Sequence, residues 1–336
     1  MGDRKTDVGG SSAAAGATVP EAAPAVAYET LLSSEQLHAM AESFADEVAY
    51  EVVGGASHTF AEWDAGASRL AGGLIRAGVA PGDRVVIHLD GSNFLKWLVA
   101  YAAIHRAGAV AVPANTQLAR PEVETMLSHS GAKAALVEEH LLDKYAHQAP
   151  DLLVAVPSAS RPAASSTADL NWSSVADRDE DYFQVPRERS DLADILYTSG
   201  TTGSPKAVAV RHENASMLPF TKPRWTASRW LHASPPYTFA GLSFVYTPMK
   251  LGMGGMYMPS FDTDTWFDTV ERDRPSAAFL VPAMATLLIE HPRFATADLG
   301  SIQLCTVGSA PLAPAVLEQL QGKLDSALVS NNYGMT

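Results

Sequence analysis

The sequence predicts an α/β protein in which mostly parallel sheets carry helices on their faces. Short, uniformly apolar segments such as "RVVIHL" alternate with segments whose apolar residues recur at helical spacing. Strands of this kind are buried on both faces, which is typical of parallel sheets covered by helices. Thr59 and Glu62 have the spacing of a helix capping box, so the first helix is expected to begin there and to end at Gly78.

The remaining elements of the first half follow the same alternation. After the turn "APGD" comes the strand "RVVIHL", and a helix centred on Trp97 and Tyr101 is closed by Gly108 before the strand "AVAV". Pro121 is expected to open a further helix that runs to about Ser130, and "AALV" supplies the next strand. The spacing therefore predicts repeated strand and helix units.

Changes in composition divide the chain into four segments. A leader rich in Gly, Ala, Ser and Pro is expected to be disordered, and a stretch rich in Pro, Ser and acidic residues is expected to connect two α/β subdomains. The expected ranges are 1–27 for the leader, 28–156 for the first subdomain, 157–190 for the connection and 191–336 for the second subdomain.

Charge and cysteine content exclude several classes of function. The net charge is -13, which repels phosphate backbones, so nucleic acid is not an expected partner. The single cysteine, Cys305, cannot form an internal disulfide and is expected to be a buried small hydrophobe, which suits a reducing cytoplasm. The longest apolar run, which starts at Trp97, is interrupted by His105 and Arg106, so no membrane span is predicted.

The segment "YTSGTTGSPK", from Tyr197 to Lys206, has the composition of an anion-binding loop. Its glycines let backbone N–H groups line a concave surface, its hydroxyls add donors, and Lys206 adds a positive charge. A polyphosphate is the expected ligand. The spacing differs from that of a Walker A loop, because Pro205 precedes the lysine and no Ser or Thr follows it.

Four motifs occur in an order that resembles the adenylate-forming superfamily, which includes acyl-CoA synthetases, luciferases and the adenylation domains of peptide synthetases. "YTSGTTGSPKAV" resembles its phosphate loop and "ASPPYTFAGL" its acyl-pocket segment. "GSAPL" resembles its adenine-binding turn, and "NNYGMT" resembles the start of its Tyr-Gly-x-Thr-Glu motif. The resemblance implies the large N-terminal domain of that family, with two stacked, mostly parallel β-sheet subdomains. It also implies that the chain stops before the β-barrel and the small C-terminal domain.

The resemblance implies an enzyme that joins a carboxylic acid to ATP, forms an acyl-adenylate and passes the acyl group to coenzyme A. The expected partners are a fatty or other hydrophobic acid, ATP or AMP, coenzyme A and Mg²⁺. Two alternatives stay open: an adenylation enzyme that loads a carrier protein, and a protein that binds or thioesterifies an acyl-adenylate without making it. A plain nucleotide-binding module is a third possibility. The sequence does not indicate the oligomeric state.

The resemblance also assigns roles to individual residues of this sequence. The residues expected to hold the β- and γ-phosphates are Thr198, Ser199, Gly200, Thr201, Thr202, Gly203 and Lys206. Those expected around the adenine are Gly308, Ser309, Ala310, Pro311, Asn331, Asn332 and Tyr333, while Thr336 is expected at the α-phosphate, with Lys206 and Thr336 as the catalytic pair. The acyl pocket is expected to include Tyr237, Thr238, Phe239 and Gly241.

The sequence departs from the family pattern at three places. Thr238 occupies a position that is commonly histidine or an aromatic residue in relatives, and Asn332 stands where many acyl-CoA synthetases have glycine. The sequence ends at Thr336, one position before the glutamate that would hold Mg²⁺, so no metal ligand is expected in this chain and the histidines show no metal-ligand spacing. The fragment alone is therefore expected to be inactive.

Overall fold

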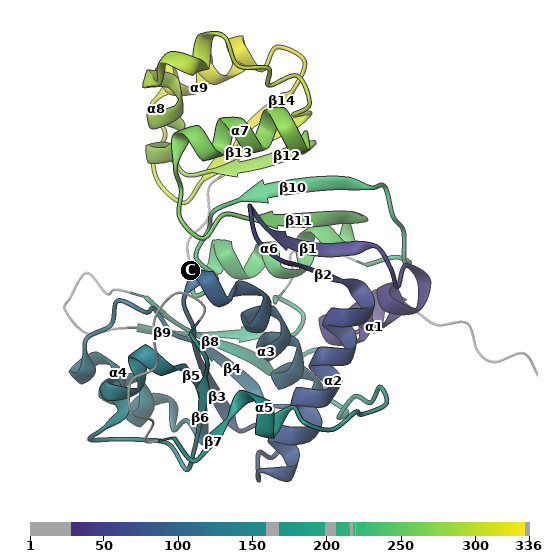
Figure 1. Ribbon diagram of the computed structural model, residues 1–336, viewed down its shortest axis with the longest axis vertical. Helices are drawn as coiled ribbons and strands as arrows, with labels where there is room; N and C mark the ends of the chain where they lie inside the picture. Colours follow the sequence, from purple (N-terminus) through teal and green to yellow (C-terminus); the bar gives the residue numbers. More distant parts are fainter. Residues whose placement is uncertain (1–27, 159–167, 199–205, 216–217, 219, 333–336) are drawn as a thin grey trace, which may run out of the picture.

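The protein contains two seven-stranded sheets separated and covered by helices (Figure 1). The structure, a computed structural model, describes residues 28–158, 168–198, 206–215, 218 and 220–332. The expected leader at 1–27 therefore lies outside the described residues. The α/β class and the two stacked, mostly parallel sheets predicted from the sequence are confirmed.

The first sheet has the strand order β7-β6-β5-β3-β4-β8-β9. All neighbouring strands in it are parallel except the last pair, β8 and β9. Its strands are β3 (Arg84–His88), β4 (Val110–Pro113), β5 (Ala134–Glu138), β6 (Leu152–Val156), β7 (Leu170–Asn171), β8 (Leu192–Thr198) and β9 (Lys206–Arg211).

The second sheet has the order β14-β13-β12-β10-β11-β1-β2, and only β1 and β2 are antiparallel. Its strands are β1 (Val48–Val52), β2 (Ser57–Thr59), β10 (Ser228–His232), β11 (Met253–Tyr257), β12 (Ala277–Leu280), β13 (Leu304–Gly308) and β14 (Leu328–Asn332).

The two sheets do not divide the chain at the expected connection. Strands β1 and β2, from the segment 28–156, complete the second sheet, while β8 and β9, from the segment 191–336, complete the first. The connection expected at 157–190 also contains β7, which pairs with β6, and a single-turn helix α5 (Trp172–Val175). The segments therefore exchange strands, and a boundary at 157–190 does not separate the sheets.

A layer of helices between the sheets forms the largest core. It consists of α1 (Ser33–Ser43), α2 (Phe60–Arg76), α3 (Phe94–Arg106) and α6 (Phe239–Lys250). Its side chains pack with Tyr50 of one sheet and Ile87 of the other in a single buried cluster. Helix α2 begins as predicted, because the Thr59 hydroxyl accepts from the Glu62 N–H and the Glu62 carboxylate accepts from the Thr59 N–H.

The outer faces of the two sheets have their own cores. Helix α4 (Arg120–Ser130) covers the first sheet, and α7 (Thr263–Asp273), α8 (Pro282–Glu290) and α9 (Pro314–Lys323) cover the second (Figure 1). Cys305 of β13 is buried, as predicted, and burial raises the pKa of its thiol to about 12. Within the described parts of the chain, no helix combines the length and the apolar character that crossing a membrane requires.

Candidate active site

The predicted phosphate segment is framed by two adjacent strands. Strand β8 ends at Thr198 and β9 begins at Lys206, and these two residues are Cα partners in the antiparallel pair. The Lys206 side chain is exposed, so its charge is available at this end of the strands. The intervening Ser199, Gly200, Thr201, Thr202 and Gly203 lie outside the described residues, so their roles stay predictions.

A pocket of about 310 Å³ opens beside the end of β8. It lies at the carboxyl ends of β4 and β8, the edge of a parallel sheet at which α/β proteins bind ligands. The described residues that line it are Pro113, Ala114, Asn115, Leu118, Glu122, Met126, Leu196, Tyr197, Thr198, Tyr237, Thr238 and Phe239. The structure thus brings part of the predicted phosphate segment next to part of the predicted acyl segment.

Several of these residues were not singled out from the sequence. Asn115 follows β4, and Glu122 and Met126 belong to α4. The position of Asn115 just after a predicted strand was the one available signal, because strand ends meet at one edge of a parallel sheet. The α4 residues carry no local motif that indicates a pocket.

Thr238 is the N-cap of helix α6 and fixes the turn between the predicted acyl segment and this helix. Its Oγ1 accepts from the Gly241 N–H at 3.0 Å and donates to the Pro235 carbonyl oxygen at 2.8 Å. A Cβ atom at Gly241 would lie 1.9 Å from the same Pro235 oxygen, so only glycine fits there. The hydroxyl of Thr238 is therefore engaged by the backbone, although the residue also borders the pocket.

The two predicted adenine segments meet at the ends of adjacent strands. Gly308 ends β13 and is the Cα partner of Asn332, the last residue of β14. Ser309 follows with a φ of 72°, a left-handed conformation that is unusual for a residue other than glycine. Ser309, Ala310 and Pro311 are exposed, as are Asn331 and Asn332. Tyr333 and Thr336 lie outside the described residues.

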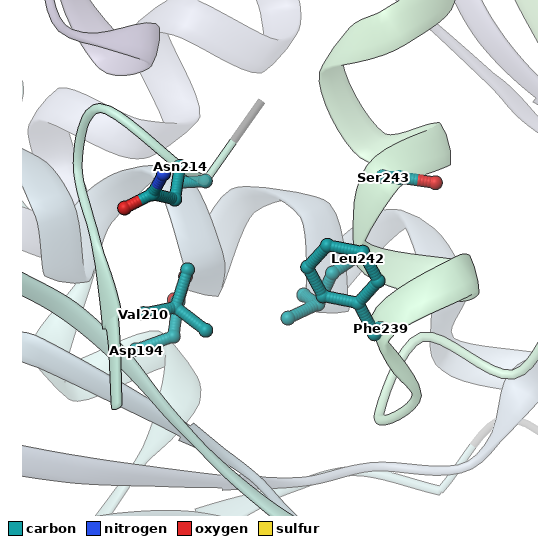
Figure 2. A pocket seen from close by; sticks show the side chains of 7 residues that line it. Asp194, Val210, Asn214, Phe239, Leu242 and Ser243 are labelled. Carbon is teal, nitrogen blue, oxygen red and sulfur yellow. The ribbon is translucent and has the colours of Figure 1, made fainter. Parts of the chain in front are cut away.

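A second, much smaller cavity lies beneath the site, between β8 and α6 (Figure 2). Its volume of about 10 Å³ is the room that a single water needs. Asp194, which borders it, is fully buried and accepts from the Tyr101 hydroxyl at 3.1 Å, with His105 Nε2 also at 3.1 Å. These hydrogen bonds tie β8 to α3, and the cavity itself is too small for a substrate.

The described residues that line the pocket include one carboxylate. Glu122 is the carboxylate that borders the pocket, and its Oε2 accepts from the Ala119 N–H at 2.7 Å as part of the helix cap. Mg²⁺ is usually bound through one or two carboxylates together with waters and substrate phosphates, so these residues supply at most one of its ligands.

The fold and the site define a two-sheet α/β protein whose motif-bearing segments gather at the carboxyl ends of its strands. Residues 37–336 match the family model of AMP-binding enzymes, and the chain belongs to this family. The resemblance to the adenylate-forming superfamily is thereby confirmed.

Named relatives lie among acid–CoA ligases. The chain is 34% identical over 289 residues to a feruloyl-CoA synthase of Amycolatopsis sp., covering 84% of this chain and 55% of the relative. It is 30% identical to the long-chain-fatty-acid–CoA ligase FadD13 of Mycobacterium tuberculosis, covering 83% and 54%. The inhibitor-bound N-terminal domain of FACL13 from Mycobacterium tuberculosis has a similar structure, with a TM-score of 0.75, 26% identity, and coverage of 91% and 75%. The chain therefore spans about half the length of these curated relatives.

Proposed function

We propose that this chain carries the nucleotide- and acid-binding part of an ATP-dependent acid–CoA ligase. In the first half-reaction a carboxylate oxygen attacks the α-phosphorus of ATP, pyrophosphate leaves, and an acyl-adenylate forms. In the second, the thiol sulfur of coenzyme A attacks the acyl carbon and AMP leaves. Mg²⁺ is the metal that such a reaction uses with ATP, and it would require ligands other than the described residues of the pocket.

The observation that carries this proposal is the convergence of motifs from distant parts of the chain. Thr198, at the end of β8, lines the same pocket as Tyr237 and Phe239, which follow β10 of the other sheet, and Lys206 is the Cα partner of Thr198. Ligand sites of α/β proteins lie at the carboxyl ends of the strands. Polar segments without a shared role would not be expected to converge there. Membership of the AMP-binding enzymes supports the same function.

The chemistry requires positive charge and aligned donors, because the attack draws an anionic carboxylate toward a phosphate. Lys206 supplies an exposed cation at the start of β9. We assign Lys206 and the segment that starts at Thr198 to the β- and γ-phosphates. Gly308 to Pro311 and Asn331 to Tyr333 are assigned to the adenine, and Thr336 to the α-phosphate.

The proposed acid is hydrophobic. Leu118, Met126 and Phe239 give the pocket apolar walls, and no lysine or arginine is among its described lining residues. The relatives named for feruloyl and long-chain fatty acids act on acids of this general kind. The cytoplasm is the proposed location, since both ATP and coenzyme A are found there.

Nucleotide binding by the chain itself tests the proposal directly. Isothermal titration with ATP and with AMP is the measurement, and Lys206→Ala is expected to weaken ATP binding while AMP binding changes little, because AMP lacks the β- and γ-phosphates. Lys133→Ala is the matched control, since Lys133 is also exposed, pairs with Asp151 and precedes β5, at the end of the sheet opposite the pocket. Absence of binding to ATP, AMP and a hydrophobic acyl-adenylate analogue would refute the nucleotide site.

The acceptor and the first half-reaction need separate assays on the active ligase. Acid-dependent exchange of labelled pyrophosphate into ATP is expected, and its absence alongside tight acyl-adenylate binding would favour the non-adenylating alternative. Competition between coenzyme A and a phosphopantetheinyl carrier protein as thiol acceptor distinguishes the ligase from a carrier-loading enzyme. The non-adenylating alternative is retained because the Thr238 hydroxyl is already bonded to the backbone in the α6 cap.

A further inference from the structure

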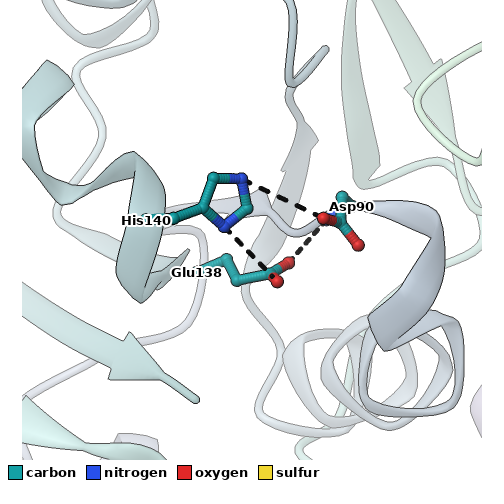
Figure 3. A group of neighbouring side chains, drawn as sticks. All are labelled: Asp90, Glu138 and His140. Carbon is teal, nitrogen blue, oxygen red and sulfur yellow. Dashed lines mark hydrogen bonds and ion pairs between the residues drawn. The ribbon is translucent and has the colours of Figure 1, made fainter. Parts of the chain in front are cut away.

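Asp90, Glu138 and His140 form a compact group of potential metal ligands outside the candidate active site (Figure 3). One ligand atom from each residue lies within 4.8 Å of the other two. Asp90 follows β3, Glu138 is the last residue of β5, and His140 lies in the short 3₁₀ helix after β5. The expectation that the histidines have no metal-ligand spacing overlooked this group, because its members come from two separate strand ends.

The group occupies a place where parallel sheets commonly bind ligands. Strands β3 and β5 are neighbours in the first sheet, and both end at its carboxyl edge. The chain after β3 enters α3 in the central layer, while the chain after β5 packs with α4 on the opposite face. Adjacent strands whose connections leave to opposite faces create a crevice at their carboxyl ends. The three residues lie at this edge of the sheet.

Glu138 makes no direct ion pair with a lysine or arginine among the described residues, and the nearby Lys96 acts on it only at longer range. Its side chain is fully buried, and the hydrogen bonds it accepts come from neutral donors, the Asp90 N–H at 2.9 Å and the Ser158 hydroxyl at 2.7 Å. Among the described residues no lysine or arginine lies within 4.0 Å of it, and the Lys96 ammonium donates to the Pro157 carbonyl oxygen instead. A buried carboxylate requires a compensating charge.

His140 faces both carboxylates and makes no hydrogen bond through its buried Nδ1 atom. The side chain is 13% exposed, Nδ1 lies 3.5 Å from Glu138 Oε1, and Nε2 lies 4.0 Å from Asp90 Oδ2. The other carboxylate oxygen of Asp90 accepts from the Ser92 N–H at 2.8 Å, so Oδ2 is the atom turned toward the histidine. The two imidazole nitrogens thus face different carboxylates, and one ligand atom from each of the three residues still lies within 4.8 Å of the other two.

We propose that Asp90, Glu138 and His140 bind a divalent transition-metal ion, with Zn²⁺ as the best fit. One imidazole and two carboxylates are ligands that Zn²⁺ accepts, and the imidazole disfavours Mg²⁺ and Ca²⁺, which prefer oxygen. Tetrahedral Zn²⁺ with bonds of about 2.1 Å holds its ligand atoms about 3.4 Å apart, so the ligand atoms, which now lie within 4.8 Å of one another, would have to close by up to about 1.4 Å. Asp90 is partly exposed, its Oδ2 takes no part in the Ser92 hydrogen bonds, and water completes the fourth position.

Metal titration of the chain tests this site independently of any ligase activity. Protein stripped with a chelator is titrated with Zn²⁺ by calorimetry, and with Co²⁺ by visible absorption, whose intensity reports a four-coordinate site. One equivalent is expected to bind. His140→Ala and Asp90→Asn should each weaken binding by more than about tenfold. His147→Ala is the control, because His147 is exposed and pairs with the single carboxylate of Glu124, and it should leave the titration unchanged.

Two results would overturn the site. One is the absence of a Zn²⁺ equivalent that depends on His140. The other is an imidazole of His140 that NMR shows to be protonated at neutral pH and insensitive to added Zn²⁺, since an imidazolium would then supply the charge that Glu138 needs. Glu138→Gln is not relied upon alone, because a change at a fully buried carboxylate can prevent folding. The metal titration of Glu138→Gln is interpreted only if circular dichroism shows that the variant is folded.

Discussion

The Nδ1 atom of His129 lies 2.9 Å from the phenolic oxygen of Tyr197, and the two rings meet edge to face. His129 is in the last turn of α4, and Tyr197 immediately precedes Thr198 at the end of β8. The pair therefore ties a surface helix to the strand that leads into the predicted phosphate segment. Burial raises the pKa of Tyr197, so its phenol stays protonated and is able to donate at neutral pH.

His129→Ala is expected to lower the free energy of unfolding by about 1 kcal/mol, the net worth of one hydrogen bond. It should also weaken ATP binding, because the start of the phosphate segment loses an anchor. His129→Asn places a polar group near the position of Nδ1 and should restore part of both losses. Urea unfolding and ATP titration are the measurements, and equal values for the Ala variant and the wild type would contradict the anchoring role.

Arg106 joins α3 to α2 through a fully buried ion pair. Its guanidinium donates to the Asp64 carboxylate at 2.5 Å and to the Ser68 hydroxyl at 2.7 Å. Arg106→Met is expected to lower the free energy of unfolding by about 3 kcal/mol, because the buried Asp64 carboxylate loses its guanidinium partner and keeps only the His38 contact. Chemical denaturation measures this loss. Arg272→Met is the control: Arg272 is exposed and pairs with its neighbour Asp273, so a change within about 0.5 kcal/mol is expected.

The same pair predicts a dependence of stability on acid. Burial raises the pKa of Asp64, but the hydrogen bond from His38 and the charge of Arg106 outweigh it and leave the pKa below the ordinary value of 3.8. A carboxylate with a lowered folded pKa stabilises the protein above its unfolded pKa and loses that contribution as the pH falls through the folded value. The stability difference between wild type and Asp64→Asn should therefore shrink from pH 7 toward pH 3 in denaturation curves. A constant difference would contradict it.

Thr238→Ala should lower the free energy of unfolding by about 1 kcal/mol, because α6 loses its N-cap. Thr238→Ser keeps the hydroxyl that bonds Gly241 and Pro235 and should retain most of the stability. Thermal and urea unfolding of the two variants give the comparison. Equal destabilisation by Ala and Ser would show that the methyl group, rather than the cap, is what matters.

Ser309→Gly is expected to be neutral or to stabilise the protein by up to about 1 kcal/mol. Glycine relieves the left-handed conformation at a φ of 72°, although it adds freedom to the unfolded chain. Ser309→Val should destabilise, because a β-branched side chain is more strained there. Opposite signs for the two variants in denaturation experiments are the expected signature of backbone strain.

The sequence predicted those features that depend on local patterns. The α2 cap at Thr59 and Glu62, the helix that Pro121 opens and the burial of Cys305 all follow from neighbouring residues, and all are confirmed. The opening of the phosphate segment after a strand is confirmed at Thr198. The functional roles of the predicted site residues stay predictions.

Features that depend on contacts between distant segments were not predicted. The pairing of β1 with β11 joins residues about two hundred positions apart, and nothing in the local pattern around Tyr50 specifies Gly255 as its partner. A Cβ at Gly255 would lie 2.1 Å from the Tyr50 ring. The need for glycine at this position is therefore clear only once the pairing is known. The group of Asp90, Glu138 and His140 was not predicted for the same reason, because these residues become neighbours only when β3 and β5 pair.

Each half of the chain contributes two strands to the sheet that the other half mainly builds. Cleavage in the exposed stretch after β7 would leave one piece with β1 and β2 but without β11, and the other with β8 but without β4. Neither piece then has a complete scaffold. The two pieces should consequently reassemble by complementation when they are refolded together, and each should aggregate when it is refolded by itself.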